Sequence, residues 1–409
     1  MTTTINNEHK KLNVPNLRFP EFQGEWAKCT LNEVCKFHNG RAYKQTELLA
    51  AGKYRVLRVG NFFTNDSWYY SNLELEDNKY AQNGDLLYAW SASFGPRFWR
   101  EEKVIFHYHI WKIDSFKNVD KNFLYHFLDL DSAKIKNEVQ GGTMVHITKG
   151  DMEKRTISYP SVLEQRNIAR FLFLLDERIA TQNKIIEDLK KLKSAIVEKV
   201  FCSPNQEYPM CRIEGFEQSL STYKMSDFSS RIATKNKDSK CSLVLTIAAQ
   251  YGLVNQESFF NKSVASENLT GYYLLHKGEF AYNRSYSAGY DWGTVKRLDN
   301  YDEGVLSTLY ICFKINETIV DSDYLAYYFE STKWHRGLSD IAGEGARNHG
   351  LLNVSMADYF NTKHRFPVIE EQKAIAKILN AITEKERKAT LLGECYQKQK
   401  QYLLCQMFT

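Results

Sequence analysis

Hydrophobic residues recur at alternating four- and three-residue steps in two long stretches of the chain. The first stretch runs from Ile168 to Val200 and the second from Ile375 to Met407. This spacing places the apolar positions on one stripe of an α-helix and is typical of helices that pair along a seam. The sequence therefore predicts two long helices that pair as an antiparallel coiled coil. The seam residues are Ile168, Leu172, Leu175, Ile179, Ile186, Leu189, Ile196, Ile375, Leu379, Ile382 and Leu403.

The two stretches are copies of each other, 207 residues apart, with no gap in the alignment. Each copy opens with a proline, which suits the first turn of a helix because its missing N–H costs nothing there. Repetition in register favours pairing of the two helices over the alternative that each helix covers only the core of its own domain. The matched positions include Pro160 and Pro367, Glu164 and Glu371, Gln165 and Gln372, Ala169 and Ala376, Lys193 and Lys400, and Phe201 and Phe408.

Two globular blocks separate and precede these helices, and they are rich in aromatic and β-branched residues with glycine-bounded apolar runs. The two blocks share a weaker sequence similarity, because the segment 84–93 aligns with the segment 278–287. The fold class we predict is α+β with a pseudo-twofold internal repeat. Its four parts are an N-terminal domain at 1–159, a first spacer helix at 160–204, a C-terminal domain at 205–366 and a second spacer helix at 367–409.

Composition narrows the class of protein without naming a function. The chain has 409 residues, 43% of them hydrophobic and 25% charged, which is ordinary for a globular protein. Its aliphatic and aromatic runs, such as Phe171 to Leu175, are far too short to span a membrane, and its first residues lack the apolar core of a secretory signal, so we expect a cytoplasmic protein. The net charge of +5 permits a nucleic-acid partner but does not require one.

Catalytic and metal-binding patterns are weak. The eight cysteines contain no C-x-x-C pair, which argues against a zinc site, and no phosphate-binding loop of the common G-x-x-x-x-G-K-[ST] type is present. His107 and His109 are expected on the same face of a strand, as packing or surface residues. Asp85, Glu101 and Lys103 could be arranged as a metal-dependent nuclease, although solvated surface charges are the simpler interpretation. We therefore predict no catalytic residue and no metal ligand.

Loops of both globular blocks carry groups that recognise DNA. Arginine forks onto guanine, asparagine pairs with adenine, and hydroxyl and lysine groups hold phosphate. Two similar domains joined by a helical spacer predict a split site whose halves lie about 34–36 Å apart, one turn of B-DNA. The DNA-binding candidates are Arg41, Tyr43, Lys44, Arg58, Asn61, Ser91, Ser93, Arg97, Asn283, Arg284, Ser285, Tyr286, Arg347 and Asn348.

Three features together resemble one known family. They are the alternation of a variable domain with a repeated helix, the segments 84–95 and 141–147, and the helix start that contains Pro160, Glu164 and Gln165. With them, the chain resembles the specificity subunit of type I restriction-modification systems over almost its whole length. The segment 141–147 adds Thr143 and His146 to the DNA-binding candidates.

The resemblance implies a non-catalytic chain with two target-recognition domains, each reading one half of a bipartite, asymmetric DNA site. It implies two methyltransferase subunits as partners, which use S-adenosylmethionine to methylate adenine N6, and two restriction subunits that use ATP and magnesium. The chain itself would bind none of these cofactors. Two alternatives remain open at this point, namely a self-contained metal-dependent DNA endonuclease and a coiled-coil scaffold without a role on DNA.

Overall fold

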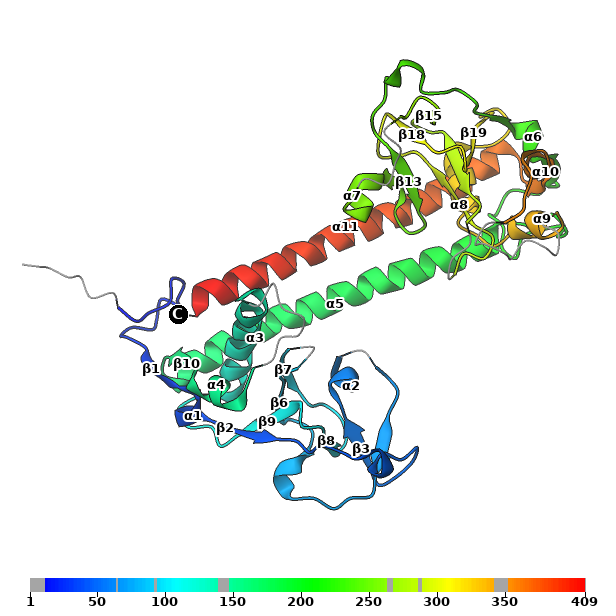
Figure 1. The fold of residues 1–409 in the computed structure, drawn as a ribbon. Helices are drawn as coiled ribbons and strands as arrows, with labels where there is room; N and C mark the ends of the chain where they lie inside the picture. The colour runs from blue at the N-terminus through cyan, green and yellow to red at the C-terminus, as the bar shows by residue number, and fades with distance from the viewer. Residues whose placement is uncertain are drawn as a thin grey trace, which may run out of the picture. The chain divides into compact units, whose positions relative to one another are not determined.

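The computed structural model describes residues 12–63, 65–91, 94–138, 147–262, 268–285, 289–341 and 352–408. The chain divides into two compact units, and these are not successive halves. Unit 1 combines Met1–Asn183 with Leu392–Thr409, whereas unit 2 is the continuous stretch Lys184–Leu391. Two long helices, α5 (Val162–Val200) and α11 (Ile369–Met407), each begin in one unit and end in the other (Figure 1). Both helices and both mixed domains agree with the predicted α+β class.

Unit 1 is built on two four-stranded sheets, ordered β2-β9-β6-β7 and β4-β3-β8-β5, and a two-stranded ribbon, β1-β10. Its strands are β1 (Ala27–Thr30), β2 (Lys36–Asn39), β3 (Tyr54–Leu57), β4 (Tyr69–Ser71), β5 (Tyr80–Ala81), β6 (Leu86–Ala89), β7 (Gly95–Phe98), β8 (Val104–Phe106), β9 (Ile110–Asp114) and β10 (Thr156–Tyr159). Its shorter helices are α1 (Leu31–Val34), η1 (Gln45–Glu47), α2 (Val59–Phe63), η2 (Asp77–Lys79), α3 (Lys121–Glu138) and α4 (Lys149–Lys154).

Unit 2 repeats this plan. The sheet β12-β19-β16-β17 corresponds to β2-β9-β6-β7, and the ribbon β11-β20 corresponds to β1-β10, with β13-β14 and β15-β18 as further pairs. Its strands are β11 (Ser221–Lys224), β12 (Ser229–Arg231), β13 (Leu245–Ala248), β14 (Gly252–Asn255), β15 (Tyr273–His276), β16 (Phe280–Asn283), β17 (Thr294–Arg297), β18 (Glu303–Leu306), β19 (Ile311–Ile315) and β20 (Lys363–Phe366). Its shorter helices are α6 (Met225–Phe228), η3 (Lys237–Ser239), α7 (Gln256–Phe260), α8 (Ser322–Tyr328), α9 (His335–Ser339) and α10 (Met356–Asn361).

The central strand of unit 1 is buried on both faces. Because successive side chains of a strand point to opposite sides, Leu86 and Tyr88 enter one apolar cluster together with α3 and α5, while Leu87 and Ala89 enter a second cluster against β8. All four residues of β6 are buried, which explains why this strand reads as a continuous apolar run rather than an alternating one. In strand β16 of unit 2, Phe280 and Tyr282 likewise enter one apolar cluster and Ala281 enters another, whereas Asn283 is half-buried.

The repeated glutamate at the start of each long helix holds the chain segment that leads into the first strand of its unit. Arg18 donates from Nε to Glu164 Oε1 at 2.7 Å and from a terminal nitrogen to Glu164 Oε2 at 2.8 Å. In unit 2, Arg212 makes the equivalent forked pair with Glu371, the shorter contact being 2.7 Å. Both carboxylates are 1% exposed, so the two ion pairs are largely shielded from water.

The repeated glutamine beside it fastens the same helix to the loop before α3 or α8. The Gln165 side chain accepts from the Asp120 amide at 2.7 Å and donates to the carbonyl groups of Asn118 and Pro160, each at 2.9 Å. Gln372 makes the same contacts with Asp321, Ile319 and Pro367. The matched Glu-Gln pairs in the sequence are therefore a repeated structural clamp.

The residue that follows each long helix packs into the core of the unit in which the other long helix begins. Phe408 packs on Phe123 of α3 in unit 1 with ring centroids 4.9 Å apart, and Phe201 packs on Tyr324 of α8 in unit 2 at 5.0 Å. Lys400, also in unit 1, pairs with Asp176 of α5 at 2.7 Å. Within unit 1 the start of α5 thus lies beside the end of α11, so the two helices run antiparallel there.

The predicted seam is covered along both helices. Every seam residue is buried or half-buried, including Gln182 and the matched lysines Lys193 and Lys400. Gly393 also lies buried on this seam, and α11 continues through it without interruption. In the described part of the chain, neither these helices nor any shorter one combines the length and the apolarity that crossing a bilayer requires.

Candidate nucleic-acid interface

The turn between β8 and β9, residues 107–109, is the centre of a polar and aromatic surface in unit 1. Backbone hydrogen bonds fix all three residues: the amides of His107 and Tyr108 donate to Leu57 and Arg41 carbonyls at 2.9 and 3.1 Å. The His109 carbonyl accepts from the Trp90 amide at 3.1 Å. The sequence-based expectation that the two histidines share a strand face is wrong, because this tripeptide passes from one sheet to the other.

Trp90 supports the turn from below. It is the first residue after β6, and its indole Nε1 donates to the Tyr108 carbonyl at 2.8 Å. The indole also stacks on Trp111 at 5.7 Å, and Trp111 stacks in turn on the fully buried Tyr88 at 5.8 Å. A ladder of three aromatic rings therefore ties the turn to the core, and the Tyr108 side chain remains 39% exposed at its apex.

Two predicted DNA-binding residues lie directly against this turn. Tyr43 stacks on His107 with ring centroids 6.3 Å apart, and Arg41 lies over the Tyr43 ring at 5.4 Å. The guanidinium of Arg41 also pairs with Glu47 at 2.7 Å, whereas the neighbouring Lys44 side chain is exposed. This part of the surface therefore presents Arg41, which is held by its ion pair with Glu47, and the exposed Lys44.

Arg58 and Asn61 extend the same surface from the end of β3. Arg58 donates to Asn61 Oδ1 at 3.3 Å and lies over the Tyr69 ring at 4.3 Å. Burial, reinforced by the positive charges of His109 and Arg58, lowers the pKa of His107 to about 4. The His107 imidazole is consequently neutral at pH 7, so it can both donate and accept a hydrogen bond.

Two other predicted residues of unit 1 differ in exposure. Ser91 is buried, and Arg97 packs over the rings of Phe62 and Phe63 while it donates to the Phe62 carbonyl. Arg97 nevertheless remains exposed, so these contacts do not remove it from the surface. Ser93, Thr143, His146, Tyr286, Arg347 and Asn348 lie outside the described residues.

Unit 2 presents a matching turn, residues 307–310, between β18 and β19. Arg284, the first residue after β16, donates to the Leu309 carbonyl at 3.3 Å and to the Val354 carbonyl at 3.2 Å. It therefore takes the place of Trp90, and Leu309, with 59% of its side chain exposed, takes the place of Tyr108. Beside it, Asn283 accepts from the Ser285 amide at 3.0 Å. Sequence reasoning missed both Tyr108 and Leu309, because a single exposed tyrosine or leucine carries no motif.

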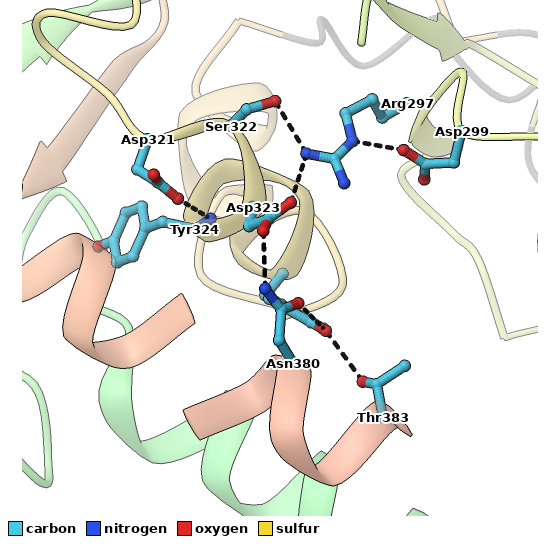
Figure 2. Close-up of polar contacts among 9 residues, drawn as sticks. Arg297, Asp299, Asp321, Ser322, Asp323, Tyr324, Asn380 and Thr383 are labelled. Atoms are coloured by element: carbon cyan, nitrogen blue, oxygen red, sulfur yellow. Dashed lines mark hydrogen bonds and ion pairs between the residues drawn. The ribbon is translucent and has the colours of Figure 1, made fainter. Parts of the chain in front are cut away.

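In unit 2, a network of polar side chains connects the sheet β12-β19-β16-β17 to the long helix α11 (Figure 2). Arg297 at the end of β17 pairs with Asp323 of α8 at 2.7 Å, and Asp323 accepts from Asn380 of α11 at 2.7 Å. Tyr327 donates to Asn380 and shares a hydrogen bond with Thr383. Although burial opposes ionisation, hydrogen bonds from Asn380 and Arg297 hold the pKa of Asp323 below its usual value.

Unit 1 makes the same joint from aromatic rings. Phe98 of β7, which occupies the position of Arg297 in the strand register, stacks on Tyr125 of α3 at 5.1 Å. Tyr125 stacks on Phe173 of α5 at 5.5 Å, and Phe173 is the residue that the repeat aligns with Asn380. The two units therefore have the same arrangement of sheet and helices, but polar side chains connect them in unit 2 and aromatic rings connect them in unit 1.

The nuclease alternative receives no support from the geometry. Asp85 pairs with Lys112 at 2.8 Å, Glu101 pairs with Arg55 at 2.9 Å, and Lys103 lies over the Tyr80 ring at 4.0 Å. Each of the three residues proposed for that chemistry thus has a partner of its own. Across the described ranges, three or more His, Cys, Asp or Glu side chains are nowhere grouped so that they could hold a metal ion.

Comparison with known proteins finds similarity to one family model and to two specificity subunits. Residues 23–191 match the model of the type I restriction modification DNA specificity domain. The MjaVIII specificity subunit of Methanocaldococcus jannaschii is 30% identical over 122 residues, which cover 30% of this chain and 29% of that protein. The EcoBI specificity subunit of Escherichia coli is 22% identical over 202 residues, covering 47% of this chain and 42% of that protein. The matches thus span less than half of either relative.

Solved structures extend the likeness to the whole chain at the level of the fold. The type I restriction-modification S subunit from M. genitalium shares 16% identity, with a TM-score of 0.57 over 97% of this chain and 99% of that one. A chain from a study of type I complex assembly and conformational transition shares 14% identity, with a TM-score of 0.52 over 93% of this chain and 96% of that one. Residues 23–191 are therefore similar to the type I restriction modification DNA specificity domain, and the chain as a whole shares the fold of the S subunit from M. genitalium.

Proposed function

We propose that the chain is the DNA specificity subunit of a type I restriction-modification complex. In this role it binds a bipartite, asymmetric DNA site, one half per recognition domain, and performs no chemistry itself. The observation that carries the proposal is that the two units repeat the same fold but differ in the side chains of their equivalent turns. Both units repeat the Glu-Gln clamp and the central sheet, whereas the turn that ends β8 differs from the turn that ends β18.

The chemistry of these surfaces suits duplex DNA. Arg58, Lys44 and Asn61 supply cationic and amide groups for phosphate oxygens and base edges, and a neutral imidazole at His107 adds a donor and an acceptor. Since the two surfaces carry different side chains on the same frame, the two half-sites should differ in sequence.

The partners are proposed on the same basis. Two methyltransferase subunits would use S-adenosylmethionine to methylate adenine N6, and two restriction subunits would use ATP and magnesium to translocate and cut, all in the cytoplasm. The long helices α5 and α11 would set the number of base pairs between the half-sites. This division of labour leaves substrate recognition as the sole task of the present chain.

The decisive experiment maps methylated adenines by single-molecule sequencing in a host that expresses the chain with its methyltransferase subunits. A split motif should appear with the chain and disappear without it. Exchanging residues 205–366 for the corresponding block of a relative should then change one half of the motif and preserve the other. Methylation that is independent of the chain, or an exchange that alters both halves, would contradict the proposal.

A further inference from the structure

Two exposed side chains occupy equivalent turns in the two units. Tyr108 stands at the apex of the turn that connects β8 to β9, and Leu309 stands at the apex of the turn that connects β18 to β19. Their exposed fractions are 39% and 59%. An exposed aromatic or aliphatic side chain on a fixed backbone is a typical contact residue, because little conformational entropy is lost when it meets a partner.

An equivalent side-chain hydrogen bond fixes the backbone of Tyr108 and of Leu309. In each unit the first residue after the central strand reaches across and donates a side-chain hydrogen bond to the apex carbonyl: Trp90 to Tyr108 at 2.8 Å, and Arg284 to Leu309 at 3.3 Å. Each turn is also closed by a backbone bond, from Ile110 to the His107 carbonyl at 2.9 Å and from Tyr310 to the Ser307 carbonyl at 3.2 Å.

The surroundings of Tyr108 indicate what it meets. Its ring lies beside the imidazoles of His107 and His109, at centroid distances of 4.5 and 3.9 Å, and the two imidazoles are 4.9 Å from each other. Arg41, whose carbonyl accepts from the Tyr108 amide, contributes a cationic edge. Flat rings beside a cationic group suit a nucleobase and its phosphate.

We propose that Tyr108 and Leu309 are corresponding base-contacting residues, one for each half of the DNA site. This inference rests on the proposed function and assigns it to particular side chains. Tyr108 can place its hydroxyl against a base edge, where it either donates or accepts a hydrogen bond. Leu309 has no polar group and would contact the methyl group of a thymine. The different chemistry of the two apices is then one physical source of the asymmetry between the half-sites.

The test uses the chain together with its methyltransferase subunits and compares Tyr108→Ala, Leu309→Ala and the unchanged chain. Methylated-adenine sequencing gives the motif, and competition binding with duplexes that carry each base at each position gives the discrimination. A lost direct base contact should lower discrimination about 5- to 150-fold at one base pair. Tyr108→Ala should relax one position in one half-site, and Leu309→Ala should relax one position in the other.

The two variants control for each other, and Tyr208→Ala serves as a neutral control, since Tyr208 is 48% exposed and lies between α5 and β11. Tyr108→Gln adds a second readout, because an amide at the apex should create a preference for adenine rather than only a loss. It also keeps the proposal testable if the alanine variant is poorly folded.

Each outcome decides a separate question. If the unchanged chain yields no split motif, the proposed function fails. If the split motif appears but all apex variants keep it unaltered, the function stands and the present inference is overturned. An equal loss of discrimination in both half-sites, with the melting temperature retained, would also overturn it, because an apex residue contacts only its own half.

Discussion

Replacing Arg18 with alanine should open the start of α5 without unfolding the rest of the molecule. The substitution removes both hydrogen bonds to Glu164 and leaves a carboxylate that is 1% exposed without its cation. Removing one partner of a buried ion pair costs about 3–5 kcal/mol. Because the Arg18 side chain is itself 16% exposed, we expect the lower end, about 3 kcal/mol, which corresponds to about a 160-fold change in a local opening equilibrium.

Hydrogen exchange followed by mass spectrometry measures this directly. Peptides that cover the first turns of α5 and strand β1 should exchange up to about 160-fold faster in Arg18→Ala, whereas peptides of unit 2 should be unchanged. Arg166→Ala is the matched control, since Arg166 lies in the same region of α5 but is 68% exposed and pairs with Asp120 at 3.6 Å. Exposed pairs of this kind contribute about 0–1 kcal/mol.

A double variant tests the cause. Replacing Arg18 and Glu164 together by methionine removes the stranded charge, so that most of the protection should return. If Arg18→Ala exchanges no faster than Arg166→Ala, or if the double variant is as unprotected as the single one, the ion pair does not stabilise the helix start in the way described here.

Three further predictions concern the helices and their joints. Because the pKa of Asp323 is held low, its ionised form stabilises unit 2 above pH 4, and this contribution is lost as the pH falls through the pKa of the folded state; hydrogen exchange in α8 should therefore rise on acidification, and Asp323→Asn should abolish that dependence. Phe408→Ala should cost about 3–5 kcal/mol, the range for a buried phenylalanine, and exchange should rise in α3 of unit 1 rather than in unit 2, where α11 begins. Deleting one heptad from the middle of both α5 and α11 should shorten the gap in the methylated motif by about 3 base pairs, since a heptad of helix is about 10 Å long, and an unaltered gap would refute their role as a spacer.

The long helices could be predicted from the sequence because their period is a local property. Steps of four and three residues need no knowledge of the partner, and the register of the repeat located both helices to within a few residues. By contrast, the placement of Phe408 in the core beside Phe123 is a tertiary contact between segments almost 300 residues apart. No local pattern marks such a contact, although the alignment of Phe408 with Phe201 hinted that both positions matter.

The polar and aromatic surface of unit 1 was predicted less completely. Arg41, Arg58 and Asn61 were selected by residue type; Arg41 and Arg58 follow strands β2 and β3, and Asn61 lies in helix α2. His107 and His109 were misplaced because a His-Tyr-His triplet alternates like a strand. What makes it a turn is a set of backbone bonds to Leu57, Arg41 and Trp90, which come from other strands. The packing of Arg97 on Phe62 and Phe63 depends in the same way on contacts that the sequence does not display.

The interlaced division of the chain has a consequence for biosynthesis. Unit 2 is one uninterrupted stretch that ends at Leu391, so all of it has been translated before the second half of α11 leaves the ribosome. Unit 1 lacks Leu403, Leu404, Met407 and Phe408 from its core until the end of α11 has been translated. Domains usually fold in the order in which they are made. Here the first-made domain has to wait for the final turns of α11, so folding order should reverse synthesis order, and a ribosome that stops early would release a chain whose second half is complete and whose first half is not.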